Sequence, residues 1–399
     1  MSGQNGANAT TSSPRVLILL KTEAAFARGI LRSFVSAAHE HGWTPLHYHP
    51  DENVGWLVNE WAPAAVIVGP ALSRQELATF ARVPLVSVAF DRSADGVASV
   101  CLDEAAIGRL ALEHLLATGL RRFSCFRLSN SPYLIERERA FVAGARAAGA
   151  MVSSCWGSQE QQQVESPTAI LQWLRDLEKP CGIFTCTDRW GALVARYAGV
   201  AGLRVPEDVA LVGADNDMLE CELIVPPLSS VIIPWHGVGE SAAELVRLAL
   251  SGAAIAGQRS VLGPIAVAGR RSSDVFAADD PLVTKALRWI RDNAGRRITV
   301  ESVARALGGG RQRLERRFRA VLHRTVHEEI RRAHVDVAKG LLETTDMSLA
   351  QIAGQSGFTN ASLLSVAFRR ELGSAPGVYR RRVQRELGRV GETRTGRLE

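Results

Sequence analysis

The chain has 399 residues, of which 46% are apolar and 22% are charged. This composition allows two or three packed domains and excludes fibrous and wholly disordered classes. Six scattered cysteines without a CxxC pair indicate a reducing compartment, rather than a disulfide framework or a zinc site. The sequence contains neither a signal peptide nor an apolar run of about 18 residues, so we expect a cytoplasmic protein.

The charge is divided unevenly along the chain. Residues 281–399 hold 24 Lys and Arg against 12 Asp and Glu, a net charge of +12, whereas residues 1–280 have a net charge of −6. Such asymmetry is typical of a basic partner-binding module attached to an acidic body, although a solvated basic helical surface gives the same count. The positions of the basic residues must decide between the two.

Residues 14–276 alternate short apolar runs with longer amphipathic segments. This alternation predicts parallel sheets that are covered by helices on both faces. The expected strands are 16–20, 65–68, 84–90, 123–126, 182–186, 209–212 and 230–233. The expected helices are 25–39, 103–116, 135–148, 189–201 and 237–250.

Polar residues follow several of these strands, and in parallel sheets ligands bind beyond the carboxyl ends of the strands. Asp91, Asp188 and Asp215 each come shortly after an expected strand, and Arg137 lies near the start of an expected helix. Carboxylates accept hydrogen bonds from neighbouring hydroxyls, Arg donates to hydroxyl oxygens, and an indole such as that of Trp190 packs on the C–H face of a sugar. These residues suit a polyhydroxyl ligand, and helix capping by the aspartates is the alternative.

Residues 83–276 resemble the sugar-binding domain of the LacI/GalR repressor family. The matching stretches are VPLVSVAFDR (83–92), VCLDEAAIGRLALEHLLATGLRRF (100–123), ERERAFVAGARAAG (136–149), IFTCTDRWGALVARYAGVAGLRVPEDVALVGADN (183–216) and PPLSSVIIPWHGVGESAAELV (226–246). The resemblance implies two lobes hinged around a ligand cleft. It places the family's ligand-binding residues on Arg137, Thr187, Asp188 and Asp215, and we expect Asp91, Trp190 and Asn216 to lie beside them.

The basic region 281–385 contains two helix-turn-helix patterns. In the first, a short helix from Thr299 ends at the glycines 308–310 and is followed by a basic helix over 311–320. In the second, residues 349–358 are followed by a helix over 359–370, and a helix over 326–342 is expected to hold the two units together. Two recognition helices on one support can enter successive major-groove faces when they lie about 34 Å apart. The pattern therefore favours DNA as the partner.

The same region, residues 283–385, resembles the DNA-binding domain of the AraC/XylS family. The resemblance is carried by ITVESVARALGGGRQRLERRFR (298–319) and SLAQIAGQSGFTNASLLSVAFRRELGSAPGVYRRR (348–382). It places the base-reading positions on Arg311, Gln312, Glu315 and Arg316, with Arg313 projecting beside them, and on Ala361, Ser362, Ser365 and Val366 of the second unit. Arg pairs with guanine, Gln with adenine and Glu with the cytosine amine, whereas Arg369 and Arg370 are expected to touch phosphates.

We therefore expect an α/β two-lobed, periplasmic-binding-protein-like sensor followed by an all-α domain with two helix-turn-helix units. The expected parts are a disordered tail at 1–13, the sensor at 14–276, a linker at 277–282, the DNA-binding domain at 283–385 and a basic tail at 386–399. The resemblances imply a transcription regulator, expected to be an activator, that senses an aldose such as D-xylose and binds double-stranded operator DNA as a homodimer. An activator also implies RNA polymerase as a partner. A different monosaccharide, a sugar acid or a repressor are the alternatives, and we expect neither catalysis nor a metal or cofactor because no such motif is present.

Overall fold

The computed structural model describes residues 13–22, 25–49, 55–69, 72, 74–153, 155–157, 166–275, 280–322 and 324–386. The chain splits into two compact units, which are residues 1–102 with 234–262, and residues 103–233 with 263–399. The expected tails at 1–13 and 386–399 lie outside the described residues, apart from their innermost residues. Within the expected linker at 277–282, helix α10 (Pro281–Asp292) already begins at Pro281, and residues 276–279 are not described.

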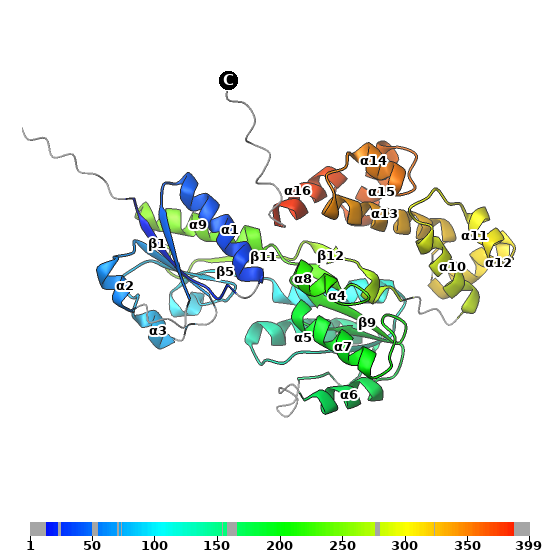
Figure 1. The fold of residues 1–399 in the computed structure, drawn as a ribbon, viewed down its shortest axis with the longest axis horizontal. Helices are drawn as coiled ribbons and strands as arrows, with labels where there is room; N and C mark the ends of the chain where they lie inside the picture. The colour runs from blue at the N-terminus through cyan, green and yellow to red at the C-terminus, as the bar shows by residue number, and fades with distance from the viewer. Residues whose placement is uncertain are drawn as a thin grey trace, which may run out of the picture. The chain divides into compact units, whose positions relative to one another are not determined.

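The first unit is built on one parallel six-stranded sheet in the order β11-β5-β4-β3-β1-β2. Its strands are β1 (Arg15–Leu19), β2 (Thr44–Tyr48), β3 (Ala65–Val68), β4 (Leu85–Val88), β5 (Ala98–Leu102) and β11 (Arg259–Leu262). Helices α1 (Ala25–Glu40) and α9 (Trp235–Leu250) pack against each other. Leu17 and Leu19 join a core cluster with Leu77 of α3 (Arg74–Ala78), near α2 (Gly55–Glu60). Successive residues of β1 are buried because both faces of the sheet are covered (Figure 1).

The second unit contains another six-stranded sheet, in the order β12-β10-β9-β8-β6-β7. Its strands are β6 (Arg122–Cys125), β7 (Met151–Val152), β8 (Cys181–Phe184), β9 (Val209–Ala214), β10 (Ser229–Ile232) and β12 (Ala266–Ala268). Helices α4 (Glu104–Ala117) and α5 (Pro132–Ala147) pack together, and α7 (Asp188–Val200) packs with α6 (Pro167–Asp176) and α8 (Met218–Glu222). The expectation of purely parallel sheets is wrong at one edge, where β12 pairs antiparallel with β10.

The rest of the second unit is helical. It comprises α10, α11 (Val300–Ala306), α12 (Arg311–Leu322), α13 (Val326–Thr344), α14 (Leu349–Gln355), α15 (Ala361–Leu372) and α16 (Pro376–Glu386). Val326 and Ile330 of α13 belong to a core cluster with α10, α11 and α12, whereas Val335, Ala338 and Leu342 belong to a cluster with α14, α15 and α16. The long helix α13 therefore holds both helix-turn-helix units (Figure 1).

Two sheets with helices, followed by this all-helical region, confirm the expected fold class. No helix in the described part of the chain is long and apolar enough to cross a bilayer.

Candidate ligand site and nucleic-acid interface

Arg137 of α5 is the centre of the candidate ligand site, and its side chain is only 2% exposed. Its Nε donates to the Glu104 carboxylate at 2.6 Å, and its Nη1 donates to the Cys186 carbonyl at 2.8 Å. The same Nη1 lies 3.7 Å from Oδ1 of Asp215, and the guanidinium stands over the ring of Tyr133. A buried charge requires such partners because burial removes its hydration. The contacts therefore fix Arg137 in one position.

The carboxylates around Arg137 are perturbed by burial. Burial raises the pKa of Asp215 to about 7, although Arg137 opposes the shift, and the nearby Glu104 adds to it. Burial likewise raises the pKa of Glu104 against the influence of Arg137. Burial disfavours the charged form of Arg137, but Glu104 and Asp215 outweigh this effect and hold its pKa above the ordinary value. The pKa of Glu104 and that of Asp215 are therefore set by the balance between burial, which raises them, and the cation of Arg137, which lowers them.

Asp188 is a third acid of this site. Its side chain is 1% exposed, and its Oδ2 accepts a hydrogen bond from the backbone N–H of Asp217 at 2.7 Å. Its Oδ1 is buried without a hydrogen-bond partner among the described residues. Burial, and next the neighbouring Asp215, raise its pKa well above the usual range. A buried acceptor of this kind is energetically costly unless a donor reaches it.

The structure separates helix capping from ligand binding among the acidic candidates. Thr187 caps α7 by accepting from the backbone N–H of Trp190, and Asp217 caps α8 by accepting from that of Leu219. Asp188 and Asp215 cap no helix, so the capping alternative does not account for them. Their carboxylates, together with Glu104, give the site an excess of acceptors over the donors of Arg137.

In the loop after β9, the consecutive residues Asp215 and Asn216 have different partners. Asp215 and Asn216 have positive φ angles of 109° and 52°, a conformation that non-glycine residues rarely adopt. Asp215 faces Arg137, whereas the Asn216 side-chain oxygen accepts from Nη2 of Arg270 at 2.8 Å. Backbone strain of this kind accumulates at functional sites, where the surrounding structure holds it in place.

Two other predicted residues have different surroundings. Asp91 belongs to the first unit, where its Oδ1 accepts from the backbone and hydroxyl of Ser93, and its Oδ2 forms an ion pair with Arg259 at 2.6 Å. Trp190 is half-buried and packs against the core cluster of the second unit. The structure thus brings Asp215 close to Arg137 and to Asp188, it pairs Asn216 with Arg270, and it gives Asp91 and Trp190 partners of their own.

The sequence pattern did not indicate Glu104 or Arg270. Glu104 follows the strand ASVCL (98–102), which was not predicted because Ser99 interrupts its apolar run. Recognition of that strand would have placed Glu104 among the polar residues at strand ends. Arg270 comes two residues after the short antiparallel strand β12 (Ala266–Ala268), which was not predicted either.

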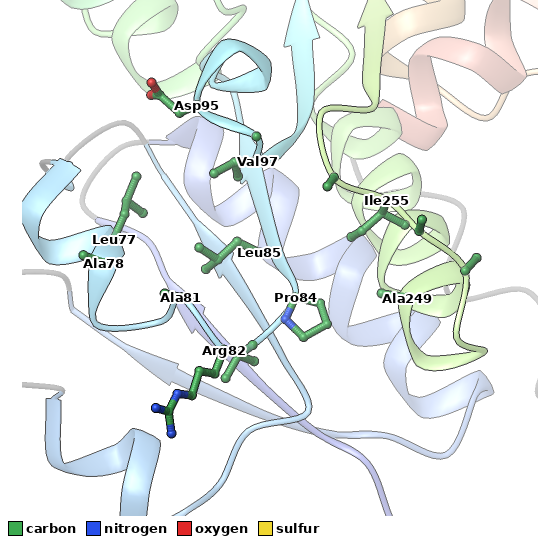
Figure 2. A pocket seen from close by; sticks show the side chains of 15 residues that line it. Leu77, Ala78, Ala81, Arg82, Pro84, Leu85, Asp95, Val97, Ala249 and Ile255 are labelled. Atoms are coloured by element: carbon green, nitrogen blue, oxygen red, sulfur yellow. The ribbon is translucent and has the colours of Figure 1, made fainter.

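A hollow of about 730 Å³ in the first unit is not the expected site. Figure 2 shows side chains of α3, β4 and the segment after α9 around it, among them Leu77, Leu85, Val97 and Ile255. It lies where strands β4 and β5 begin. Ligands of parallel sheets bind at the opposite, carboxyl ends.

The first expected recognition helix, α12, presents a basic surface. Arg311, Gln312, Arg313 and Arg316 are exposed, while Leu314 and Phe318 are buried on the opposite side. Arg311 forms an ion pair with Glu301 of α11. Glu315 is half-buried, and its Oε2 has no hydrogen-bond partner within the described chain. The exposed basic positions are those expected to reach bases.

The second expected recognition helix, α15, is less polar. Val366 is 64% exposed and the neighbouring Leu363 is 51% exposed, while Leu364 and Phe368 are buried. The hydroxyl of Ser365 donates to the Ala361 carbonyl of its own helix at 2.8 Å. Ser362, Arg369 and Arg370 are exposed. This surface suits apolar contact with thymine methyl groups, flanked by cations for phosphates.

Comparisons with known proteins agree with this division of the chain. Residues 112–273 match the periplasmic binding protein-like domain, and residues 303–382 match a helix-turn-helix domain. A solved structure titled as the xylose-binding transcription activator xylR resembles this chain with a TM-score of 0.59 and 25% identity. The match covers 93% of this chain and 98% of that one.

Two curated relatives match most of this chain. The xylose operon regulatory protein of Haemophilus influenzae is 30% identical over 286 residues, which are 70% of this chain and 74% of that protein. The protein of the same name from Escherichia coli K12 is 29% identical over 287 residues, which are 70% of this chain and 73% of that protein. The chain therefore belongs to the family of xylose operon regulatory proteins, and it is a sugar-responsive transcription regulator with an AraC-type DNA-binding domain.

Proposed function

We propose that this regulator senses D-xylose or a closely similar aldose through Arg137, Asp188, Asp215 and Asn216, with Thr187 nearby. The observation that carries the proposal is the buried Arg137, which pairs with Glu104 and lies 3.7 Å from Asp215, with the buried carboxylate of Asp188 next to Asp215. A neutral sugar offers several hydroxyl donors to these carboxylates, and Arg137 donates to a sugar oxygen. The relatives named above are xylose operon regulators, which supports a pentose.

A sugar acid is the less favoured alternative. Arg137 already pairs with Glu104 and lies 3.7 Å from Asp215, so it offers little unpaired positive charge to the carboxylate of a sugar acid. A different neutral monosaccharide fits the same acceptors, and the arrangement of its hydroxyls decides the match.

The helical domain binds double-stranded operator DNA in this proposal. Helix α12 reads bases through Arg311, Gln312 and Arg316, and α15 contributes Ala361, Ser362 and Val366. The net charge of +12 over residues 281–399 supplies the sequence-independent attraction to phosphates.

The proposal also includes a homodimer that activates transcription in the cytoplasm and contacts RNA polymerase. Leu219, Leu223 and Val225 support self-association, because these apolar side chains are 64%, 71% and 95% exposed within one short segment. Sedimentation of the full-length chain at several concentrations tests the dimer, and transcription with purified RNA polymerase separates activation from repression.

Calorimetric titration of the full-length chain tests the effector. D-Xylose, L-arabinose, D-glucose and D-glucuronate are titrated in turn, and we expect heat from D-xylose and none from D-glucuronate. Arg137→Lys removes the planar fork that contacts Glu104 and Cys186, so it should abolish the heat. Arg139→Lys, on the exposed side of the same helix, is the matched control and should bind normally. Binding of D-glucuronate alone, or unchanged binding by Arg137→Lys, would refute the proposed site.

A further inference from the structure

The segment Arg270–Asp274 contacts the loop that carries Asp215 and Asn216. Nη2 of Arg270 donates to the Asn216 side chain at 2.8 Å, and its Nη1 donates to the Leu228 carbonyl at 2.8 Å. The backbone N–H of Arg270 donates to the Ser229 hydroxyl at 2.7 Å. A planar guanidinium is needed to hold two acceptors in this fork. Arg270 thus ties the strained 215–216 loop to the segment that follows β12.

A second connection reaches the same segment through α4. Ser273 forms a hydrogen bond with Nε2 of His114 at 2.7 Å and another with the hydroxyl of Ser229 at 2.7 Å. His114 lies in the last turn of α4, and Glu104, the partner of Arg137, is the first residue of that helix. Ten residues of α-helix separate Glu104 from His114, so a displacement of α4 connects two points about 15 Å apart.

The segment also leads directly to the DNA-binding domain. Only residues 275–279 separate Asp274 from Asp280, which caps α10 by accepting from the backbone N–H groups of Leu282 and Val283. Asp274 forms an ion pair with Arg291 of α10. A change in position of 270–274 is therefore passed to the first helix of the DNA-binding domain.

We propose that residues 270–274 are the element through which bound sugar controls the DNA-binding domain, with Arg270 and Ser273 as positioning residues. Arg270 moves with Asn216, to which it is hydrogen-bonded. Ser273 is connected to Arg137 through His114, helix α4 and Glu104. The inference rests on the proposed sugar site, and it adds the route by which sugar bound there controls the DNA-binding domain. No residue of the segment needs to contact the sugar.

The His114 contact is independent of pH in the physiological range. Burial lowers the pKa of His114 to about 3, and the cations of Lys339 and Arg291 act in the same direction. The ring is therefore neutral between pH 6 and pH 8, and its hydrogen bond to Ser273 is the same throughout.

Three variants of the full-length chain test the route. Arg270→Lys keeps the charge but cannot reach Asn216 and Leu228 together, and Ser273→Ala removes the hydroxyl that joins His114 to Ser229. Arg271→Lys is the matched control, because Arg271 is the exposed neighbour in the same segment. Arg270→Lys and Ser273→Ala interrupt different connections to the ligand site, so the test remains decisive if one of the two variants does not fold.

The measurements are calorimetric titration with D-xylose and hydrogen–deuterium exchange of α10 with and without D-xylose. In the native chain and in Arg271→Lys, we expect the sugar to change exchange at 215–218 and in α10. In Ser273→Ala, the Kd for D-xylose should stay within about threefold of the native value, and in both variants exchange at 215–218 should still respond at a saturating concentration of D-xylose. The response of α10 should be lost in both. A purely structural role would weaken sugar binding and leave the response of α10 proportional to occupancy.

The outcomes separate the two proposals. If D-xylose binds and α10 responds equally in Arg270→Lys, Ser273→Ala and the native chain, the relay is refuted and the sugar site stands. If D-xylose binds the native chain without any response in α10, the relay is refuted as well. If D-xylose gives no heat and no change at 215–218 in the native chain, the proposed site fails, and the relay fails with it.

Discussion

We predict that the protonation of Asp215 makes sugar binding depend on pH. With a pKa of about 7, the ionised fraction of Asp215 falls about tenfold between pH 8 and pH 6. Only the ionised carboxylate accepts two hydrogen bonds from neighbouring hydroxyls. We therefore expect the Kd for D-xylose to rise about tenfold from pH 8 to pH 6, a loss of about 1.4 kcal/mol.

The stability of the unliganded chain should move in the opposite direction. The pKa of Asp215 in the folded state lies above its ordinary value of 3.8, so the folded chain holds this proton more tightly than the unfolded chain. Its stability contribution is present at low pH and is lost as the pH rises through about 7. Because D-xylose is expected to bind more tightly at pH 8, the increase in Tm that it causes should be larger at pH 8 than at pH 6.

Calorimetry at pH 6, 7 and 8 measures this dependence, and Asp215→Asn is the control. The amide cannot ionise, so the variant should bind D-xylose weakly and lose most of the pH dependence. A Kd that is constant from pH 6 to pH 8 in the native chain would refute the role of Asp215. The same slope in Asp215→Asn would assign the titration to another group.

Three further predictions concern the core and the interface. Glu104→Gln leaves the buried Arg137 without its anionic partner and should lower stability by about 1–3 kcal/mol, measured by thermal unfolding. Leu364→Ala should cost about 2–5 kcal/mol because Leu364 is buried, whereas Leu363→Ala at the 51% exposed neighbour should leave Tm unchanged and weaken DNA binding instead. On a duplex selected from a random library by the full-length chain, Arg316→Ala should lose about 1–3 kcal/mol and relax one base position. Arg369→Ala should instead reduce the slope of log K against log salt by about one, and equal effects of the two variants would contradict the division into base and phosphate contacts.

The sequence predicted the elements whose apolar pattern is long or uninterrupted. Strands such as AVIV (65–68) and helices such as α4 were expected because burial on both faces leaves only apolar residues in the strand. The strands β2, β5, β7, β11 and β12 were missed. They are edge strands, very short strands, or strands that carry serine or proline, so their pairing depends on neighbours that are distant in the sequence.

The central residues of the candidate site could be proposed from the sequence, whereas their contacts could not. Arg137, Asp188 and Asp215 follow from their places after strands and from the family resemblance. The pairing of Arg137 with Glu104 joins residues 33 positions apart, and that of Arg270 with Asn216 joins residues 54 positions apart. No local pattern encodes such contacts, which arise only when the sheet brings the ends of its strands together.

The rigid helix α13 restricts how a sugar can regulate DNA binding. Because α13 contributes Val326 and Ile330 to one core cluster and Val335, Ala338 and Leu342 to the other, the spacing of α12 and α15 is fixed by packing. A coupling of about 1–3 kcal/mol between sugar and DNA is too small to repack two such cores. The effector must therefore act on the helical domain as a whole, and α10 is the first helix of this domain that follows the sensor segment in the chain. Sugar should then change the affinities of the two recognition helices together, so that variants of α12 and α15 alter DNA binding without altering the ratio of affinities with and without sugar.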